Sequence, residues 1–362
     1  MMFFYRMHYS NVHRGAYYLS EQATAEYEKA RETVARFVNA GSREIVFTRS
    51  ATESINLAAA SWGMHNLKPG DEILLSEAEH HANLVPWQMV RDQTGCTLNF
   101  FAVNDDGSFN PENFYRALTP RTKLVGVAGI SNVLGTVFPV KEIAAAAHAN
   151  GALCLVDACQ SVVHQKIDVK DIGCDFLAFS GHKTYGPTGI GVLYGRYELL
   201  AAMPPYQTGG DMVKSVTLQH TEFAEPPARF EAGTPAIAEA VGLGAALEYM
   251  SRLGMENIAA HEKALMDYAL TRLAEIPELK VVGTAPDKGG VIAFALGSIH
   301  PQDVAFVLDK EGVAIRTGHH CAEPIVNRIG YTSLARASFG LYTTKEDIDR
   351  FVAALNKAKS FF

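Results

Sequence analysis

The stretch Phe176-Leu177-Ala178-Phe179-Ser180-Gly181-His182-Lys183 decides the fold class of this chain. Its first four residues form a short apolar run, which is typical of a buried parallel strand. A lysine just past the end of such a strand is placed where it can hold an aldehyde as an imine. Upstream, the apolar run 152–156 ends in Asp157, a second charged residue at a strand end. The interval between Asp157 and Lys183 leaves room for one crossover between neighbouring parallel strands.

Lys183 and Asp157 together make the pair that pyridoxal phosphate enzymes need. In such enzymes the lysine forms a Schiff base with the cofactor. The aspartate keeps the pyridine nitrogen protonated, so that the ring can withdraw electrons. The sequence therefore predicts pyridoxal 5'-phosphate as the cofactor.

Short apolar runs rich in branched residues recur in the first two thirds of the chain and predict buried parallel strands: 72–76, 123–130, 152–156 and 175–180. Helical patterns lie between them, such as 140–150 with Gly151 as its C-cap. This alternation predicts an α/β domain with a mostly parallel sheet, of the seven-stranded type, over residues 1–240.

The pattern changes after about residue 240. Two long amphipathic helices are expected at 259–276 and 344–358, with shorter strands between them at 290–296 and 313–316. We therefore expect a smaller C-terminal α+β domain over residues 241–362. A helix running through 242–244 is the alternative that this boundary leaves open.

Length and composition restrict the class of protein. The chain has 362 residues, 48% of them hydrophobic, and a formal net charge of −7. Acidic and basic residues are interspersed, without the Lys/Arg blocks that bind nucleic acid or lipid. No apolar stretch approaches the ~20 residues that span a bilayer, and the N-terminus lacks a signal-peptide layout. A cytoplasmic protein is expected.

The five cysteines, Cys96, Cys154, Cys159, Cys174 and Cys321, include no C-x-x-C pair. Their number is odd and the chain is long, so a disulfide framework is not expected. Four of them lie in or beside predicted strands and packed loops, which suits ordinary buried thiols. Cys321 is the exception.

Polar residues follow several predicted strands at the edge where α/β sheets bind ligands. They are His80 and His81, Ser131 and Asn132, Asp157 and Gln160, and Ser180, His182 and Lys183. Taken alone, Asn132 is more typical of a turn. Neighbours on an extended chain point opposite ways, so only one of His80 and His81 is expected to face a ligand.

A phosphate site is predicted where the strand 45–48 leads into a helix. Ser50 and Glu53 have the spacing of a capping box, and Thr52 adds a hydroxyl to the free N–H groups of the helix N-terminus. A capped helix without a ligand is the alternative. Ser180 and His182 are the further phosphate ligands that we expect.

Several motifs of this chain, in this order, resemble those of one family: His80-His81-Ala82-Asn83, Ser131-Asn132-Val133-Leu134-Gly135-Thr136, Leu155-Val156-Asp157 with Gln160, Ser180-Gly181-His182-Lys183, Arg229-Phe230-Glu231-Ala232-Gly233-Thr234-Pro235 and Arg316-Thr317-Gly318-His319-His320-Cys321-Ala322. They resemble the Suf-type (group II) cysteine desulfurases of the class V aminotransferase family. The resemblance runs from about Val12 to the C-terminus.

The resemblance implies a fold-type-I pyridoxal phosphate homodimer and a sulfurtransferase activity. L-Cysteine would become L-alanine, and its sulfur would pass as a persulfide to an acceptor protein of the Suf type for iron–sulfur cluster assembly. The resemblance also implies which residues bind the cofactor: Lys183 as the Schiff base, Asp157 at the ring nitrogen, Gln160 at the ring oxygen, His80 stacked on the ring, Thr52, Ser180 and His182 at the phosphate, and Thr234 at the phosphate of the partner subunit.

For the substrate, the resemblance implies that Arg336 clamps the carboxylate with help from Asn132, and that Arg316 lies close by. A planar guanidinium suits this role because it binds a carboxylate through two parallel hydrogen bonds. Cys321 would accept the sulfur.

Cys321 would attack as a thiolate, and free thiols ionise near pH ~8.5, so nearby cations would help. Arg316, His319 and His320 are the expected sources of that charge, and Gly318 would let the loop move. Two other interpretations of Cys321 stay open here. It is either an inert loop thiol or, with the two histidines, part of a metal site, although no second ligand pair has zinc-type spacing.

The chain departs from the family in two ways. A further N-terminal segment of the family is missing, which we expect to affect stability and dimer packing. Cys159 stands where the family usually has a small residue. Two alternatives to a cysteine desulfurase remain open: a selenocysteine lyase or related β-lyase on the same scaffold, and a shortened non-catalytic homologue. Retention of Lys183, Asp157, Arg336 and Cys321 argues against the second.

Overall fold

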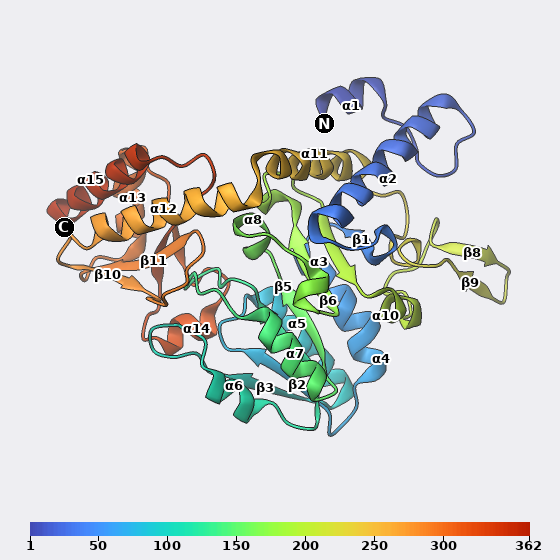
Figure 1. The fold of residues 1–362 in the computed structure, drawn as a ribbon, viewed down its shortest axis with the longest axis horizontal. Helices are drawn as coiled ribbons and strands as arrows, with labels where there is room; N and C mark the ends of the chain where they lie inside the picture. The colour runs from blue at the N-terminus through green and yellow to red at the C-terminus, as the bar shows by residue number, and fades with distance from the viewer.

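The computed structural model describes residues 1–362 and confirms the expected fold class, a mixed α/β fold with a large, mostly parallel sheet and further helices and sheets (Figure 1). The large sheet has seven strands in the order β1-β7-β6-β5-β4-β2-β3. Pairs β2–β3, β2–β4, β4–β5 and β5–β6 are parallel, whereas β7 runs antiparallel to both β1 and β6. The strands are β1 (Ile45–Thr48), β2 (Glu72–Ser76), β3 (Thr97–Phe101), β4 (Thr122–Ala128), β5 (Leu153–Asp157), β6 (Phe176–Ser180) and β7 (Gly191–Gly195).

The central strands β2, β4, β5 and β6 are buried along almost their whole length and are mostly apolar, because helices cover both faces of the sheet. Large apolar clusters form on either side of it, one including Val125, Val156 and Phe179, the other Leu124, Leu155 and Phe176. The helices of this part are α2 (Tyr18–Val38), α3 (Ala51–Leu57), α4 (Met64–Asn66), α5 (Val85–Thr94), α6 (Pro111–Ala117), α7 (Val140–Ala149), α8 (Ser161–His164), α9 (Val169–Ile172), α10 (Tyr197–Ala202) and α11 (Ile237–Leu253). Helix α7 lies where it was predicted, and Gly151 follows it at a φ of 76°.

The C-terminal part has an antiparallel sheet in the order β10-β11-β13-β12. Its strands are β10 (Leu279–Val282), β11 (Val291–Leu296), β12 (Arg316–Gly318) and β13 (Leu334–Ser338). Its helices are α12 (Met255–Leu273), α13 (Pro301–Lys310), α14 (Glu323–Arg328) and α15 (Lys345–Phe361). They pack on the sheet through an apolar cluster of their own that includes Phe294, Leu308 and Phe351.

Two expectations for this part need correction. The strand expected at 313–316 begins only at Arg316, because Val313–Ile315 precede the pairing with β13. Helix α11 is continuous from Ile237 to Leu253, so the expected boundary at residue 240 falls inside a helix. Helix α12 then leads from α11 to the small sheet (Figure 1). The division into two domains stays a prediction.

Two elements lie at the periphery of the large part (Figure 1). Helix α1 (Met2–Met7) is at the N-terminus, and the hairpin of β8 (Val213–Val216) and β9 (Thr221–Phe223) projects from the body of the molecule. None of the helices combines the length and the apolar character that a membrane crossing needs.

Candidate active site

A cavity of about 200 Å³ lies at the carboxyl ends of the parallel strands, where an open α/β sheet is expected to bind its ligand. The segments after β2, β4, β5 and β6 all contribute to its wall. Among the residues lining it are nine that the sequence predicted: Thr52, His80, Asn132, Asp157, Gln160, Ser180, His182, Lys183 and Arg316. Arg336, Cys321 and Thr234 do not line it.

Asp157 and Lys183 meet in this cavity because their strands are neighbours. Asp157 is the last residue of β5 and pairs in register with Ala178 of β6. The residue is 5% exposed, and its Oδ1 accepts a hydrogen bond from the Cys159 N–H at 3.0 Å. This bond fixes the direction of the carboxylate at the strand end.

Lys183 closes the short turn Gly181–Lys183 that follows β6. Gly181 is needed there, since a Cβ on it would lie 2.6 Å from Cγ2 of Ile190 and 3.1 Å from the Pro187 carbonyl oxygen. The tight packing fixes the backbone of this turn, and the Lys183 side chain lines the cavity from it.

The predicted phosphate site lies at the N-terminus of α3. Half of the predicted capping box forms: Ser50 Oγ accepts from the Glu53 N–H at 3.3 Å, but the Glu53 carboxylate accepts from the N–H of Arg49 and not from that of the N-cap residue Ser50. Ser180 Oγ accepts from the Ala51 N–H at 2.9 Å, which leaves the Ser180 hydroxyl hydrogen free to donate. No group of the protein accepts from the N–H or the hydroxyl of Thr52. Such a set of unused donors fits a phosphate dianion.

The two adjacent histidines diverge, as expected. His80 lines the cavity, and its Nδ1 accepts from the Ala82 N–H at 3.0 Å. Burial lowers the pKa of His80, and the opposing effect of Asp157 is smaller. The ring is therefore neutral near pH 7, which suits a flat ring stacked on an aromatic cofactor. His81 faces away from the cavity, towards the segment that carries Cys321.

Glu79 is a residue that the sequence reasoning missed. It is buried beside His80, and its carboxyl accepts from Asn83 Nδ2 at 2.7 Å and from the Ala128 N–H at 3.0 Å. Burial raises its pKa to about 8. Glu79 thereby links strand β4 to the turn on which His80 lies. In the sequence, only the position of Glu79 directly before His80 and His81 indicated a role at the site.

Two guanidinium groups come together on the small sheet. Arg316 of β12 and Arg336 of β13 are direct partners across the two strands. Arg336 Nη1 donates to the carbonyl oxygen of Asn132 at 2.7 Å, and its Nε is buried without a partner. Burial lowers the pKa of Arg336, and the charge of Arg316 lowers it further. A pair of cations with an unused N–H beside the cavity wall fits the carboxylate of a ligand.

Cys321 is exposed and lies on the turn before α14. Its carbonyl oxygen accepts from the His81 N–H at 2.7 Å, and the neighbouring carbonyl of His320 accepts from Asn132 Nδ2 at 2.7 Å. Two hydrogen bonds thus attach this turn to residues at the strand ends of the large sheet.

The expectation that His320 supplies positive charge to Cys321 needs correction. The His320 ring is buried, and its Nε2 lies 3.1 Å from the Leu334 carbonyl oxygen. Burial lowers the pKa of His320 to about 4, with the Arg336 charge acting in the same direction, so the ring is neutral near pH 7. Arg316 and its neighbour Arg336 carry permanent charges in this part of the site, and a contribution from His319 stays a prediction. No group of three or more His, Cys, Asp or Glu side chains is arranged to hold a metal ion.

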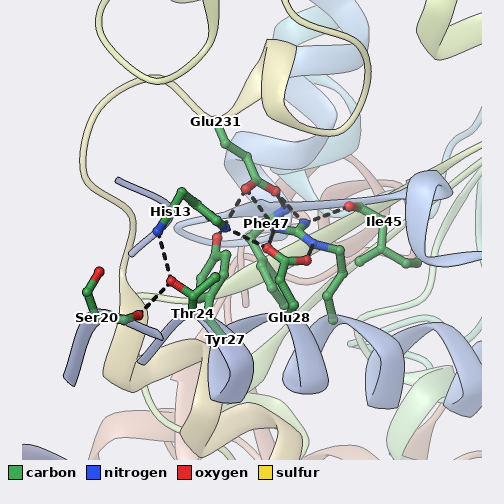
Figure 2. Close-up of polar contacts among 9 residues, drawn as sticks. His13, Ser20, Thr24, Tyr27, Glu28, Ile45, Phe47 and Glu231 are labelled. Atoms are coloured by element: carbon green, nitrogen blue, oxygen red, sulfur yellow. Dashed lines mark hydrogen bonds and ion pairs between the residues drawn. The ribbon is translucent and has the colours of Figure 1, made fainter. Parts of the chain in front are cut away.

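Thr234 lies outside the cavity of its own chain. It is exposed and lines a separate cavity of about 280 Å³. The loop that carries it is fixed through Glu231, whose carboxylate pairs with Arg31 of α2 at 2.6 and 2.9 Å and accepts from the Phe47 N–H of β1 at 2.7 Å (Figure 2). Tyr27 donates to Glu231 within this cluster, and the half-exposed Glu28 accepts from Arg31 Nε at its edge. A role for Thr234 at the site of a partner subunit stays a prediction.

Comparisons with known proteins agree with this geometry. The profile of the family "Aminotransferase class-V" matches residues 1–351. A cysteine desulfurase of Dickeya dadantii is 52% identical over 98% of this chain and 86% of its own length. A probable cysteine desulfurase of Synechocystis is 50% identical over 100% of this chain and 87% of its own.

Solved structures give the same result. The crystal structure of the cysteine desulfurase CsdA from Escherichia coli superposes with a TM-score of 0.94 at 39% identity, covering 100% of this chain and 90% of that one. The apo structure of a cysteine desulfurase from Thermococcus onnurineus gives a TM-score of 0.97 at 38% identity, with the same coverage. This chain is therefore a member of the class V aminotransferase family, in its cysteine desulfurase group.

Proposed function

We propose that this chain converts L-cysteine to L-alanine with pyridoxal phosphate and leaves the sulfur as a persulfide on Cys321. The observation that carries the proposal is the meeting of Lys183 and Asp157 in one cavity, with a guanidinium pair at its edge and an exposed thiol on the adjoining turn. Of the three possibilities that the sequence left open, the named relatives support this one.

The residues in the cavity fit the cofactor from end to end. The unused donors of Thr52 and Ser180, with His182, would hold the phosphate. Asp157 would pair with the ring nitrogen and Lys183 would hold the aldehyde carbon. His80 would cover one face of the ring, and Gln160 would donate to its oxygen.

When bound, pyridoxal phosphate supplies an aldehyde for the substrate amine and a ring that withdraws electrons from the substrate's α-carbon. The residues of this chain do the rest. The Lys183 amine, once released, is placed to move the proton at the α-carbon. The carboxylate of Asp157, fixed by the Cys159 N–H, keeps its charge directed at the ring nitrogen.

Substrate orientation would come from the arginine pair. Arg336 already donates one N–H to Asn132, and its buried Nε is left for the carboxylate of L-cysteine. Arg316 lines the cavity beside it. Fixing the carboxylate fixes the direction in which the thiol of the substrate points, and that direction determines whether Cys321 can reach it.

In the sulfur step, the Cys321 thiolate attacks the substrate sulfur. An S–S bond forms, the C–S bond of the substrate breaks, and the β-carbon takes up a proton. L-Cysteine and a thiol thus give L-alanine and a persulfide, without any external oxidant or reductant. Cys159 also lines the cavity, but burial raises the pKa of its thiol, and Asp157 adds to this shift, so it stays protonated and a poor nucleophile.

We also propose that the chain works as a homodimer and passes its sulfur to an acceptor protein of the Suf type. The exposure of Thr234 outside its own cavity supports a role at the cavity of a partner subunit. The exposure of Cys321 supports transfer of the sulfur to another protein.

The test compares Cys321→Ala with Cys159→Ala in the purified holoenzyme. We expect Cys321→Ala to keep the yellow colour and to lose sulfide release from L-cysteine, because the cofactor site is intact and the acceptor thiol is gone. Cys159→Ala should keep both. Full desulfurase turnover by Cys321→Ala would contradict the role of Cys321.

A further inference from the structure

The turn that carries Cys321 is attached to the large sheet mainly through a residue with no assigned role, His81. The His81 N–H donates to the Cys321 carbonyl oxygen at 2.7 Å. The His81 ring reaches past the cysteine, and its Nε2 accepts from the Glu323 N–H at 3.1 Å. His81 therefore contacts the chain at the carbonyl of the reactive cysteine and again two residues later.

The bond between the Glu323 N–H and His81 Nε2 determines which ring nitrogen of His81 carries the proton. Because the Glu323 N–H is the donor, Nε2 must carry a lone pair, and the ring must be neutral with its proton on Nδ1. His81 is free to adopt this role because His80, its neighbour, takes the opposite direction into the cavity. His80 thus faces the cofactor cavity, whereas His81 contacts the Cys321 turn.

The turn has a backbone that needs external support. His320 and Cys321 both have left-handed backbones, with φ of 53° and 57°, and Gly318 lies at 112°. Consecutive non-glycine residues in this region are unfavourable and persist only where the surroundings hold them. Besides the bond that His81 donates and the one that it accepts, the bond from Asn132 Nδ2 to the His320 carbonyl oxygen holds the turn in place. Loss of these contacts would let the turn relax.

We propose that His81 is a positioning residue that latches the Cys321 turn at the mouth of the cavity. The latch keeps the thiol facing the substrate sulfur, and release of the ring from the Glu323 N–H frees the turn to present the persulfide outward. This inference rests on the proposed function for its catalytic consequence. Its structural part, the restraint of the turn by the ring, does not.

The experiment uses the holoenzyme and three variants. His81→Ala removes the ring acceptor. His81→Gln restores an acceptor, because the side-chain oxygen of glutamine reaches about as far as Nε2 of histidine. Glu323→Ala is the matched control, since it removes a side chain at the same contact but keeps the N–H that donates to the ring.

The first measurement is amide hydrogen exchange of residues 319–322, read by mass spectrometry. None of these amides bonds to the His81 ring, so faster exchange would report movement of the turn and not merely the loss of one bond. We expect exchange to rise roughly three- to tenfold in His81→Ala, the effect of one lost neutral hydrogen bond. His81→Gln and Glu323→Ala should stay close to wild type.

The second measurement is the rate of alanine formation in a single turnover with L-cysteine. It should fall by a similar factor in His81→Ala and recover in His81→Gln, with the visible spectrum of the cofactor unchanged in both. Unchanged exchange in His81→Ala, or a glutamine variant that behaves like the alanine variant, would overturn the latch. If the wild type itself formed no alanine, the proposed function would fail, and the exchange measurement would still decide whether His81 holds the turn.

Discussion

Glu79 shows how a single residue connects the site to the stability of the fold. It is a buried carboxyl with a pKa raised by burial to about 8, whereas an unfolded glutamate titrates near pH ~4.3. The folded state therefore favours the protonated form. The contribution of Glu79 to stability is complete below pH ~4.3 and is lost as the pH rises towards 8.

Glu79→Gln removes this titration. We expect the free energy of unfolding of the wild type to fall, relative to that of the variant, between pH 5 and pH 8, by about 2–5 kcal/mol. Urea unfolding of both proteins across this range measures the difference. Parallel pH profiles would show that Glu79 is ionised in the fold, contrary to this interpretation.

Arg336→Lys tests the carboxylate site. A lysine keeps the charge but loses the planar fork that can bind the Asn132 carbonyl and a carboxylate together. We expect kcat/KM for L-cysteine to fall by about 10–100-fold, from the loss of one or two charge-assisted hydrogen bonds, with the cofactor spectrum unchanged. Arg91→Lys, on an exposed arginine, is the control. An unchanged kcat/KM in Arg336→Lys would exclude a bidentate role for Arg336.

The sequence predicted the cavity residues well because parallel strands bring their carboxyl ends to one edge, and the residues after them must meet there. It could not predict the roles of Glu79 and His81. Their partners, Ala128 and Glu323, are distant in the sequence, and no spacing rule connects them. The charge of His320 was wrongly expected because its burial by the turn is a tertiary effect.

At the scale of elements, a buried ion pair joins helix α2 and strand β1 to the loop that carries Thr234. Arg31 is 4% exposed and binds Glu231 through two hydrogen bonds, while a third N–H···O bond reaches the Ile45 carbonyl at 2.9 Å (Figure 2). Both charges are paired and their hydrogen bonds are satisfied, which is the condition for burying them.

Arg31→Met leaves Glu231 buried without its cation. We expect the free energy of unfolding to fall by about 3–5 kcal/mol, the usual cost of breaking a buried pair. Lys141→Met, which breaks an exposed pair with Asp171, should cost at most about 1 kcal/mol. Chemical denaturation of the three proteins measures both effects. Equal losses in the two variants would show that the Arg31 pair contributes no more than a surface contact.

Element boundaries followed the apolar pattern where the pattern was strong. Strands β2 and β6 and helix α7 lie within one residue of their expected ranges. Strand β3 was missed because most of its side chains are only partly buried, so that no apolar run marks it. Strand β12 was misplaced because pairing with β13, not local propensity, decides where it starts.

At the scale of the whole molecule, the proposed homodimer makes a distinctive prediction. A Thr234→Ala chain has a complete Lys183 cavity but no threonine for its partner, and a Lys183→Ala chain has the reverse. In a mixed dimer, the cavity with Lys183 receives an intact Thr234 from the other chain. We therefore expect the two inactive or weakened variants to regain desulfurase activity when mixed, up to about a quarter of the wild-type level by random pairing.

Light scattering of the wild type should give twice the mass of the chain, and a labelled subunit should confirm that exchange takes place in the mixture. Dimers that exchange subunits without any recovery of activity would contradict the assignment of Thr234 to the partner's site. The sequence of one chain predicts this role only through family resemblance, because an isolated protomer does not bring Thr234 to its own cavity.

The central claim is that the Lys183 amine holds the cofactor opposite the Asp157 carboxylate. Reduction of the yellow holoenzyme with borohydride fixes the cofactor to the amine that holds it, and peptide mapping by mass spectrometry then identifies that amine. We predict one modified peptide, labelled at Lys183. A label on another lysine, or none on a folded and coloured sample, would contradict the account.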